Sequence, residues 1–154
     1  MVICLSEHVV YIISMLGVED VVRKVLELGL PLGKYIVVGG GTLAVRGIRE
    51  TKDLDIVVLP ELFLELSRTW PLDKEYEGKW QRQRLKRGEV EMYPDLYLER
   101  KNIYLNLKEL IDTAEIIKGI PFQPLTHLMM CKLDTAREKD LADVELIQKY
   151  LQSH

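Results

Sequence analysis

The chain has 154 residues, which is the size of one domain and leaves little room for a second. Hydrophobic residues make up 47% of it and charged residues 29%, so the composition excludes a disordered chain, a collagen and a coiled coil. The formal net charge is −3, from 21 basic and 24 acidic residues, and it indicates no general attraction to nucleic acid or to an anionic membrane.

Nothing in the sequence indicates export or a membrane span. Cys4 and Cys131 belong to no CxxC or similar metal-binding pattern, and we expect both to be buried free thiols in a reducing compartment. The apolar run near the N-terminus has no basic flank, no cleavage signal, and fewer than the about 20 residues needed to cross a bilayer. We therefore expect a cytoplasmic protein without a membrane partner.

The first third of the chain predicts helices followed by two strands. Hydrophobic spacing predicts helices over residues 6–16 and 19–28, which would pack against the remaining core. Residues 35–38 form a short β-rich run that ends in three glycines, and a helix is predicted to start at residue 42. Residues 53–59 predict a second strand, and its apolar end indicates a central position in the sheet.

The remaining two thirds predict a hairpin and further helices. Pro60 opens a helix that ends near residue 69, and a polar connection follows. Residues 80–86 and 89–93 flank Arg87-Gly88 and predict a β-hairpin, so we expect a mixed sheet. The other predicted elements are β-like runs at 97–98 and 103–105, helices at 107–118 and 125–137, a short strand at 120–122, and a terminal helix capped by Asp140.

These elements predict a single α/β (α+β) domain over residues 1–154, with helices packed against a mixed β-sheet. We expect N-terminal helices within residues 1–30, the sheet within residues 35–106, and C-terminal helices within residues 107–154. The chemistry is expected at one end of this sheet.

The most informative segment is V-V-G-G-G-T-L-A-V-R-G-I-R-E-T-K-D-L-D-I-V-V, residues 37–58. Asp53 and Asp55 are two positions apart on a predicted strand, so their carboxylates would lie close together on one face. Like charges this close raise a pKa or require a cation, and hard oxygen ligands suit Mg²⁺ together with a substrate phosphate. The preceding glycine run would let a phosphate approach backbone N–H groups at the start of a helix.

A strand, a Gly-Gly turn into a helix, and a D-h-D-h pattern (h, hydrophobic) opening the next strand resemble the signature of the nucleotidyltransferase superfamily. These polymerase-β-like enzymes transfer a nucleoside monophosphate from an NTP and release pyrophosphate. The resemblance implies a nucleotidyltransferase fold in which Asp53 and Asp55 hold two Mg²⁺ ions, with Mn²⁺ as an alternative. It also implies that the triphosphate binds at Gly39, Gly40, Gly41 and Thr42.

The superfamily takes a third metal-binding carboxylate from a later strand. Glu91 lies between Val90 and Met92 on the predicted hairpin and is therefore the predicted third catalytic and metal-binding residue. Glu89 shares its strand face and Asp95 follows a proline, so both stand as alternatives. The superfamily usually has Asp at this position, and a Glu91 that faced solvent would indicate an inactive relative.

Residues 128–151 resemble the K-x4-R-x-K-D-x2-D tail of small stand-alone nucleotidyltransferases of the abortive-infection toxin and lincosamide-resistance type. The resemblance implies that Lys132 and Arg137 lie near the phosphates of a bound nucleotide. Upstream, Arg82, Arg84 and Lys86 alternate on a predicted strand, which indicates either a solvated edge or a surface that steers an NTP or an RNA.

The resemblance implies a Mg²⁺-dependent nucleotidyltransferase whose acceptor is a small molecule, an RNA or a protein hydroxyl. Because 154 residues leave little beyond a catalytic core, we expect a homodimer or a partner protein, as in toxin–antitoxin pairs, to complete the site. One alternative is a non-catalytic nucleotide-binding or regulatory module. Another is a Rossmann-like dinucleotide-binding protein, because Gly39-x-Gly41-x-x-Ala44 fits that fingerprint, although no repeated βαβ units follow it.

Overall fold

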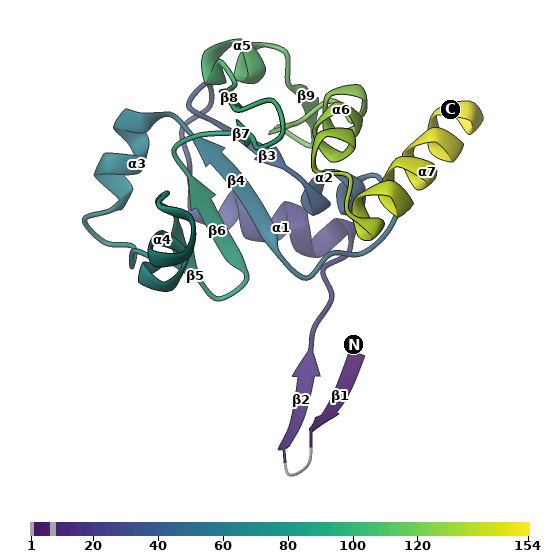
Figure 1. The fold of residues 1–154 in the computed structure, drawn as a ribbon, viewed down its shortest axis with the longest axis horizontal. Helices are drawn as coiled ribbons and strands as arrows, with labels where there is room; N and C mark the ends of the chain where they lie inside the picture. The colour runs from purple at the N-terminus through teal and green to yellow at the C-terminus, as the bar shows by residue number, and fades with distance from the viewer. Residues whose placement is uncertain (1, 7–8) are drawn as a thin grey trace.

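The computed structural model describes the backbone of residues 2–6 and 9–154 and the side chains from residue 14 onward. Its centre is a six-stranded mixed sheet in the order β5-β6-β4-β3-β10-β9 (Figure 1). Strand β4 runs parallel to β6, β3 runs parallel to β10, and the other neighbouring pairs are antiparallel. The strands span Tyr35–Val38 (β3), Leu54–Val58 (β4), Leu85–Arg87 (β5), Val90–Tyr93 (β6), Glu115–Ile117 (β9) and Ile120–Phe122 (β10).

Apart from Asp55, the two central strands β3 and β4 are apolar on both faces because both faces are covered. Val37 in β3 packs into a cluster with Val21 and Val25 of α1 (Val18–Leu28), whereas its neighbour Ile36 packs on the opposite face with Leu110 of α5 (Leu107–Asp112). All five of these side chains are buried. The alternation of strand side chains therefore produces two hydrophobic layers around one sheet.

The remaining helices flank the sheet, with α3 and α4 on one side of the molecule and α6 and α7 on the other (Figure 1). A third apolar cluster joins Leu43 of α2 to Leu128 of α6 and Ile147 of α7, so the C-terminal helices are anchored on the helix that follows β3. The described helices do not include one that is long and apolar enough to cross a membrane. The bounds are Gly40–Val45 (α2), Pro60–Leu66 (α3), Lys74–Trp80 (α4), Leu125–Thr135 (α6) and Glu138–Ser153 (α7).

The structure bears out the mixed α/β domain and corrects the first predicted helix. Val2–Ser6 (β1) and Val9–Ile13 (β2) form an antiparallel hairpin that projects from the body (Figure 1). Its second strand, V-V-Y-I-I, consists of β-branched and aromatic residues, which favour a strand over a helix even though their spacing also fits one. The expectation for the Cys4 thiol falls outside the described side chains.

Three smaller predictions were also wrong. The polar connection after α3 contains α4, whose N-cap Asp73 accepts a hydrogen bond from the Tyr76 backbone N–H at 3.1 Å. The helix predicted over residues 107–118 ends at Asp112, and β9 follows it. Asp140 is the third residue of α7 instead of its N-cap. The short runs after β6 are confirmed as β7 (Tyr97–Leu98) and β8 (Ile103–Tyr104), which form a separate antiparallel pair.

Candidate functional site

The glycine turn between β3 and α2 lies close to β4. Gly39 has a φ of 65°, in the left-handed region that favours glycine, and a β-carbon there would lie 3.3 Å from Oδ2 of Asp55. A β-carbon at Gly40 would overlap the Thr51 side chain, and one at Gly41 would lie 2.9 Å from the Val37 side chain. The protein's own packing therefore requires all three glycines, and it brings the turn against the Asp55 carboxylate.

Thr42 is fully buried, and its hydroxyl donates a hydrogen bond to the Gly39 carbonyl at 2.6 Å. The Gly39 N–H donates to the side-chain oxygen of Gln123 at 3.2 Å. Thr42 thus stabilises the turn from inside instead of presenting its hydroxyl to a ligand. The sequence analysis did not predict Gln123, which no motif singles out and which is only 1% exposed.

Two of the three expected carboxylates lie side by side. Asp55 in β4 is the register partner of Glu91 in β6, on two neighbouring parallel strands. Asp55 Oδ1 is buried and has no hydrogen-bond partner. Glu91 is also buried, and its Oε2 accepts from the Tyr93 hydroxyl at 2.9 Å and from Arg84 at 3.1 Å, while Lys86 lies 3.3 Å from its Oε1.

The pKa values of Asp55 and Glu91 are shifted in opposite directions. Burial raises the pKa of Asp55 well above its ordinary value, and the neighbouring Glu91 carboxylate raises it further. Burial opposes ionisation of Glu91 as well, but hydrogen bonds from Asp55 and Tyr93 and the charges of Arg84 and Lys86 lower the pKa of Glu91 overall. These opposite shifts favour a neutral Asp55 beside an ionised Glu91.

The third expected carboxylate, that of Asp53, is exposed to solvent. Asp53 precedes β4 and is exposed, and its backbone carbonyl accepts a hydrogen bond from the Thr51 hydroxyl at 3.0 Å. Within the described part of the chain, no three Asp, Glu, His or Cys side chains already converge as a metal cluster. Of the two alternatives for Glu91, Glu89 pairs with Lys24 of α1 and Asp95 pairs with Arg82.

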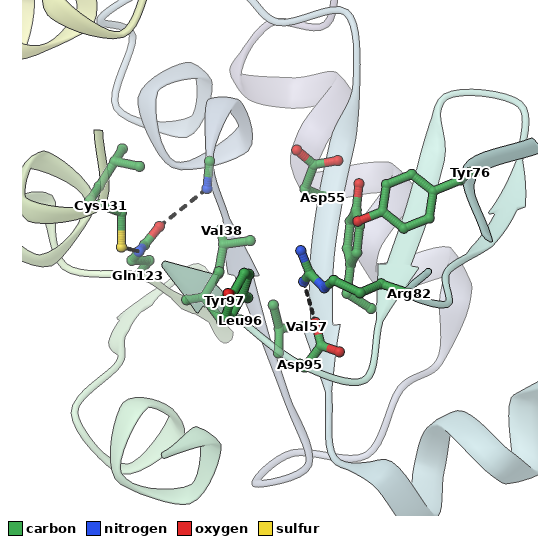
Figure 2. A pocket seen from close by; sticks show the side chains of 13 residues that line it. Val38, Asp55, Val57, Tyr76, Arg82, Asp95, Leu96, Tyr97, Gln123 and Cys131 are labelled. Carbon is green, nitrogen blue, oxygen red and sulfur yellow. Dashed lines mark hydrogen bonds and ion pairs between the residues drawn. The ribbon is translucent and has the colours of Figure 1, made fainter. Parts of the chain in front are cut away.

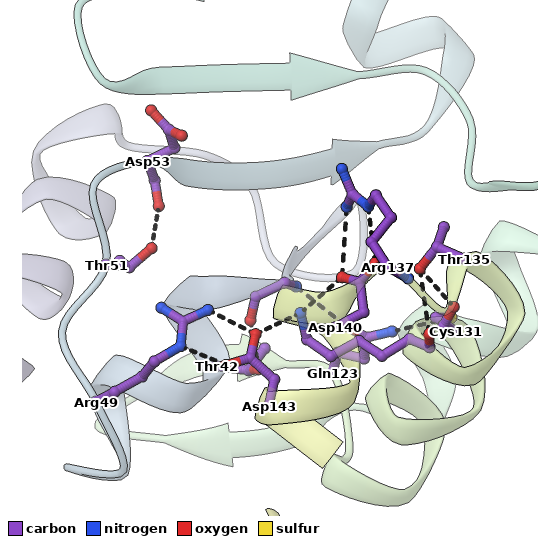
Figure 3. Close-up of polar contacts among 12 residues, drawn as sticks. Thr42, Arg49, Thr51, Asp53, Gln123, Cys131, Thr135, Arg137, Asp140 and Asp143 are labelled. Carbon is purple, nitrogen blue, oxygen red and sulfur yellow. Dashed lines mark hydrogen bonds and ion pairs between the residues drawn. The ribbon is translucent and has the colours of Figure 1, made fainter. Parts of the chain in front are cut away.

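A cleft of about 650 Å³, here called the cationic cleft, joins the glycine turn and the aspartates to α6 and α7 (Figure 3). Lys132 and Arg137, which the sequence analysis predicted, line it opposite Asp53 and Asp55. Its side chains and backbone come from Met15, Gly39, Gly40, Arg49, Thr51, Lys52, Asp53, Asp55, Lys132, Arg137, Lys139, Asp140, Ala142, Asp143 and Leu146. The cations in this set outnumber the carboxylates, which suits an anionic ligand.

Two carboxylates on α7 hold the cations of this cleft in place (Figure 3). Asp143 binds Arg49 through two hydrogen bonds of 2.7 and 2.8 Å and contacts Lys132 Nζ at 2.7 Å. Asp140 accepts from Arg137 Nε at 2.7 Å. Burial opposes ionisation of both aspartates, yet the hydrogen bonds and charges of these cations lower the pKa of each. The sequence analysis missed Arg49, which lies 94 positions from Asp143.

A second pocket, of about 230 Å³ and here called the aromatic pocket, adjoins the cationic cleft at Gly39 and Asp55 (Figure 2). It extends from them in another direction, towards α4, β6 and β7. It is lined by Val38, Gly39, Asp55, Val57, Tyr76, Arg82, Tyr93, Asp95, Leu96, Tyr97, Gln123, Leu128 and Cys131.

The aromatic pocket contains no activated nucleophile. Cys131 Sγ lies 3.8 Å from Nδ1 of His127, and Gln123 contacts both side chains. Burial raises the pKa of the Cys131 thiol to about 11 and lowers the pKa of His127. Both groups are therefore neutral near pH 7 and do not form the thiolate–imidazolium pair of a cysteine hydrolase.

Comparison with protein-family models, with curated proteins and with solved structures finds no match for this chain. Functional argument therefore depends on the sequence pattern and on the site's geometry. That geometry brings Asp55, Glu91, the glycine turn, Lys132 and Arg137 to one end of the sheet.

Proposed function

We propose that the protein is a nucleotidyltransferase that transfers a nucleoside monophosphate from an NTP to an acceptor hydroxyl and releases pyrophosphate. The observation that carries this proposal is the position of Asp55, which is register-paired with Glu91 and borders a cleft lined by Lys132 and Arg137. Carboxylates beside a cationic cleft suit a reaction in which a metal ion neutralises a polyphosphate and the protein supplies position and charge.

The residues present fit a hard divalent cation. Asp53, Asp55 and Glu91 offer carboxylate oxygens, which Mg²⁺ prefers, and Asp55 Oδ1 is a buried acceptor without a donor. When bound there, Mg²⁺ or Mn²⁺ would neutralise triphosphate charge and favour ionisation of the acceptor hydroxyl. Asp55 would have to give up its proton to bind the cation, and Glu91 would exchange its contacts with Arg84 and Lys86.

The cationic cleft would hold the phosphates. Arg137 lines the cleft with its Nη1 free of the Asp140 contacts, and Arg49 and Lys132 add positive charge beside it. Asp140 and Asp143 fix the positions of these cations before a nucleotide arrives. The glycine turn contributes space beside Asp55, where a larger residue would block the approach of a phosphate.

Metal-dependent stabilisation and pyrophosphate release test this proposal together. Each NTP with Mg²⁺ should raise the melting temperature, because a ligand that binds only the folded state stabilises it, and one NTP should release pyrophosphate in the presence of an acceptor extract. The double variant Asp53→Asn with Asp55→Asn should fold, lose the Mg²⁺-dependent part of the shift and release no pyrophosphate. Unchanged release by the double variant would remove the proposal.

Glu91 and Glu89 provide a matched pair within one strand and its turn. Glu91→Gln should slow transfer by several orders of magnitude, since it removes a charged oxygen beside Asp55. Glu89→Gln should leave transfer nearly unchanged, because Glu89 pairs with Lys24 of α1. Equal effects of the two substitutions on turnover would contradict the role of Glu91.

A second candidate function is a non-catalytic nucleotide-binding module. One observation favours it: Arg84, Lys86 and Tyr93 already satisfy the Glu91 carboxylate without a metal. Such a module would gain stability from an NTP without releasing pyrophosphate. Its nucleotide affinity would also be insensitive to Glu91→Gln, whereas the affinity of the proposed enzyme for the Mg²⁺ complex would fall.

A further inference from the structure

We propose that the aromatic pocket binds the acceptor, and that the acceptor is a neutral ring compound with a hydroxyl group. This inference rests on the proposed function, and it adds the chemical class of the second substrate. The structure supports it through two unpaired buried atoms, the charge of the pocket, and the way the pocket meets the cationic cleft.

The unpaired atoms lie in the same place. Across the described side chains, the buried polar atoms without a hydrogen-bond partner are Asp55 Oδ1 and Arg82 Nε. Both residues line the aromatic pocket (Figure 2). Buried polar atoms are nearly always paired, so an unpaired acceptor and an unpaired donor in one pocket point to a ligand that supplies both partners. A hydroxyl could donate to Asp55, and a second polar atom on the same ligand could accept from Arg82.

The remaining surface of the pocket selects against a charged ligand. Tyr76 and Tyr97 contribute aromatic side chains to the lining, and Leu96 adds an apolar wall. Arg82 is the one cation in the lining of this pocket, and Asp95 pairs with it. A phosphate-bearing acceptor would therefore find no uncompensated positive charge here, in contrast to the cationic cleft.

The size of the pocket indicates a small group. Its volume of about 230 Å³ is less than half of the about 650 Å³ of the cationic cleft. Pockets for drug-sized ligands begin at roughly 300 Å³, so one ring fits better than a whole nucleotide.

The junction of the two cavities suits in-line transfer. They share Gly39 and Asp55, and both reach α6, but the cleft continues to α7 whereas the pocket continues to α4, β6 and β7. With pyrophosphate leaving towards the cations of the cleft, in-line attack requires the acceptor oxygen to enter from the other side of the α-phosphorus, and an acceptor held in the aromatic pocket would supply it from there. The acceptor oxygen then forms a bond to that phosphorus, and the bond to the bridging oxygen breaks with its electron pair retained by pyrophosphate. The hydroxyl proton passes to solvent water.

Protection of Cys131 from alkylation tests the inference without requiring turnover. The chain has two cysteines, so Cys4→Ser leaves Cys131 as the single thiol, and it lines the aromatic pocket. Iodoacetamide labelling at pH 9 would be followed by mass spectrometry with neutral probes, namely phenol, N-acetyl-tyrosinamide and uridine. Their charged counterparts are phenyl phosphate, phosphotyrosine and uridine monophosphate. At least one neutral probe should slow labelling threefold or more, and its phosphorylated counterpart should not.

Tyr97→Ala should abolish this protection, because it removes a wall of the pocket. Tyr104→Ala is the matched control: its ring stacks on Tyr97 with centroids 4.7 Å apart, yet it is exposed and does not line the pocket. No protection by any neutral probe, or equal protection by the charged ones, would overturn the inference. Protection by an NTP alone would overturn it too, because the pocket would then hold the nucleobase.

The two proposals can fail separately. Protection by a neutral probe in a protein that releases no pyrophosphate would refute transfer and leave the pocket's ligand class standing. Pyrophosphate release without protection would keep the enzyme and refute the acceptor class.

Discussion

Replacing Asp55 with asparagine should stabilise the metal-free protein by an amount that grows with pH. Burial and the neighbouring Glu91 raise the pKa of Asp55, whereas an aspartate in the unfolded chain has a pKa of about 3.9. At a pH between these two pKa values, Asp55 is ionised in the unfolded chain but stays protonated in the folded protein. The contribution of Asp55 to stability is therefore complete at low pH and is lost as the pH rises towards the raised pKa.

The size of the effect follows from proton linkage. A difference of one bound proton changes the free energy of unfolding by about 1.4 kcal/mol per pH unit. In a domain of this size each kcal/mol shifts the melting temperature by roughly 2–4 °C. Asp55→Asn, which keeps the shape of the side chain and cannot ionise, should thus gain roughly 3–6 °C over the parent protein per pH unit above about pH 4, until the difference reaches a plateau.

Thermal melts followed by circular dichroism in EDTA, at constant ionic strength, would measure this difference from pH 4 to pH 8. Glu91→Gln is the control of opposite sign, because the pKa of Glu91 is lowered in the folded protein. Its stabilising contribution is present at neutral pH and is lost as the pH falls, so Glu91→Gln should be less stable than the parent at pH 7 and approach it in acid. A difference for Asp55→Asn that does not change with pH would refute a raised pKa of Asp55 in the folded protein.

Two further substitutions test the turn and the cleft. Gly40→Ala should destabilise the protein by about 1–3 kcal/mol in urea melts, because the added β-carbon overlaps the Thr51 side chain. Gly78→Ala in α4 is the control: its β-carbon would meet open space, so it should stabilise the protein by about 0.5–1 kcal/mol. Similar losses for both would show that Gly40 is not packed as described. Asp143→Asn should weaken Mg²⁺–ATP binding about tenfold, or about 1.4 kcal/mol, because it releases the cations that Asp143 holds. Glu145→Gln, at an exposed position of the same helix, should leave the affinity unchanged. Equal affinities of the two variants in calorimetry would contradict the role of Asp143.

The elements that build the sheet could be predicted because their signals are local. Residues 35–38 and 56–59 are apolar throughout, as strands covered on both faces must be, and the glycines after the first strand mark a turn. The N-terminal hairpin was not predicted, because an apolar run of valines and isoleucines fits both helical and strand spacing. In this segment the β-branched and aromatic residue types indicate the strand better than the hydrophobic spacing does.

Residues of the candidate site could be predicted only where they belong to a recognisable sequence motif. Asp55 and Lys132 belong to patterns that can be recognised within one segment. Gln123, in contrast, acts on the Gly39 N–H from 84 positions away, and only the pairing of β10 with β3 brings it there. Within the basic run that was expected as a solvated edge or a steering surface, Arg82 pairs with Asp95 and Arg84 binds Glu91, whereas Lys86 is exposed on β5, an edge strand of the sheet.

In the proposed enzyme, acidic residues would help to build the cleft that binds the phosphates. Asp143 lies on α7 and binds Arg49 from the segment before β4 as well as Lys132 from α6, so one carboxylate fixes cations that come from two other elements. Arginine and lysine side chains lose up to about 2 kcal/mol of rotamer entropy when a ligand immobilises them. Because the aspartates of α7 already hold these side chains, that cost falls on folding instead of on nucleotide binding. In the proposed enzyme, the K-x4-R-x-K-D-x2-D pattern would act as one unit, in which the basic residues face the phosphates and the acidic residues position them.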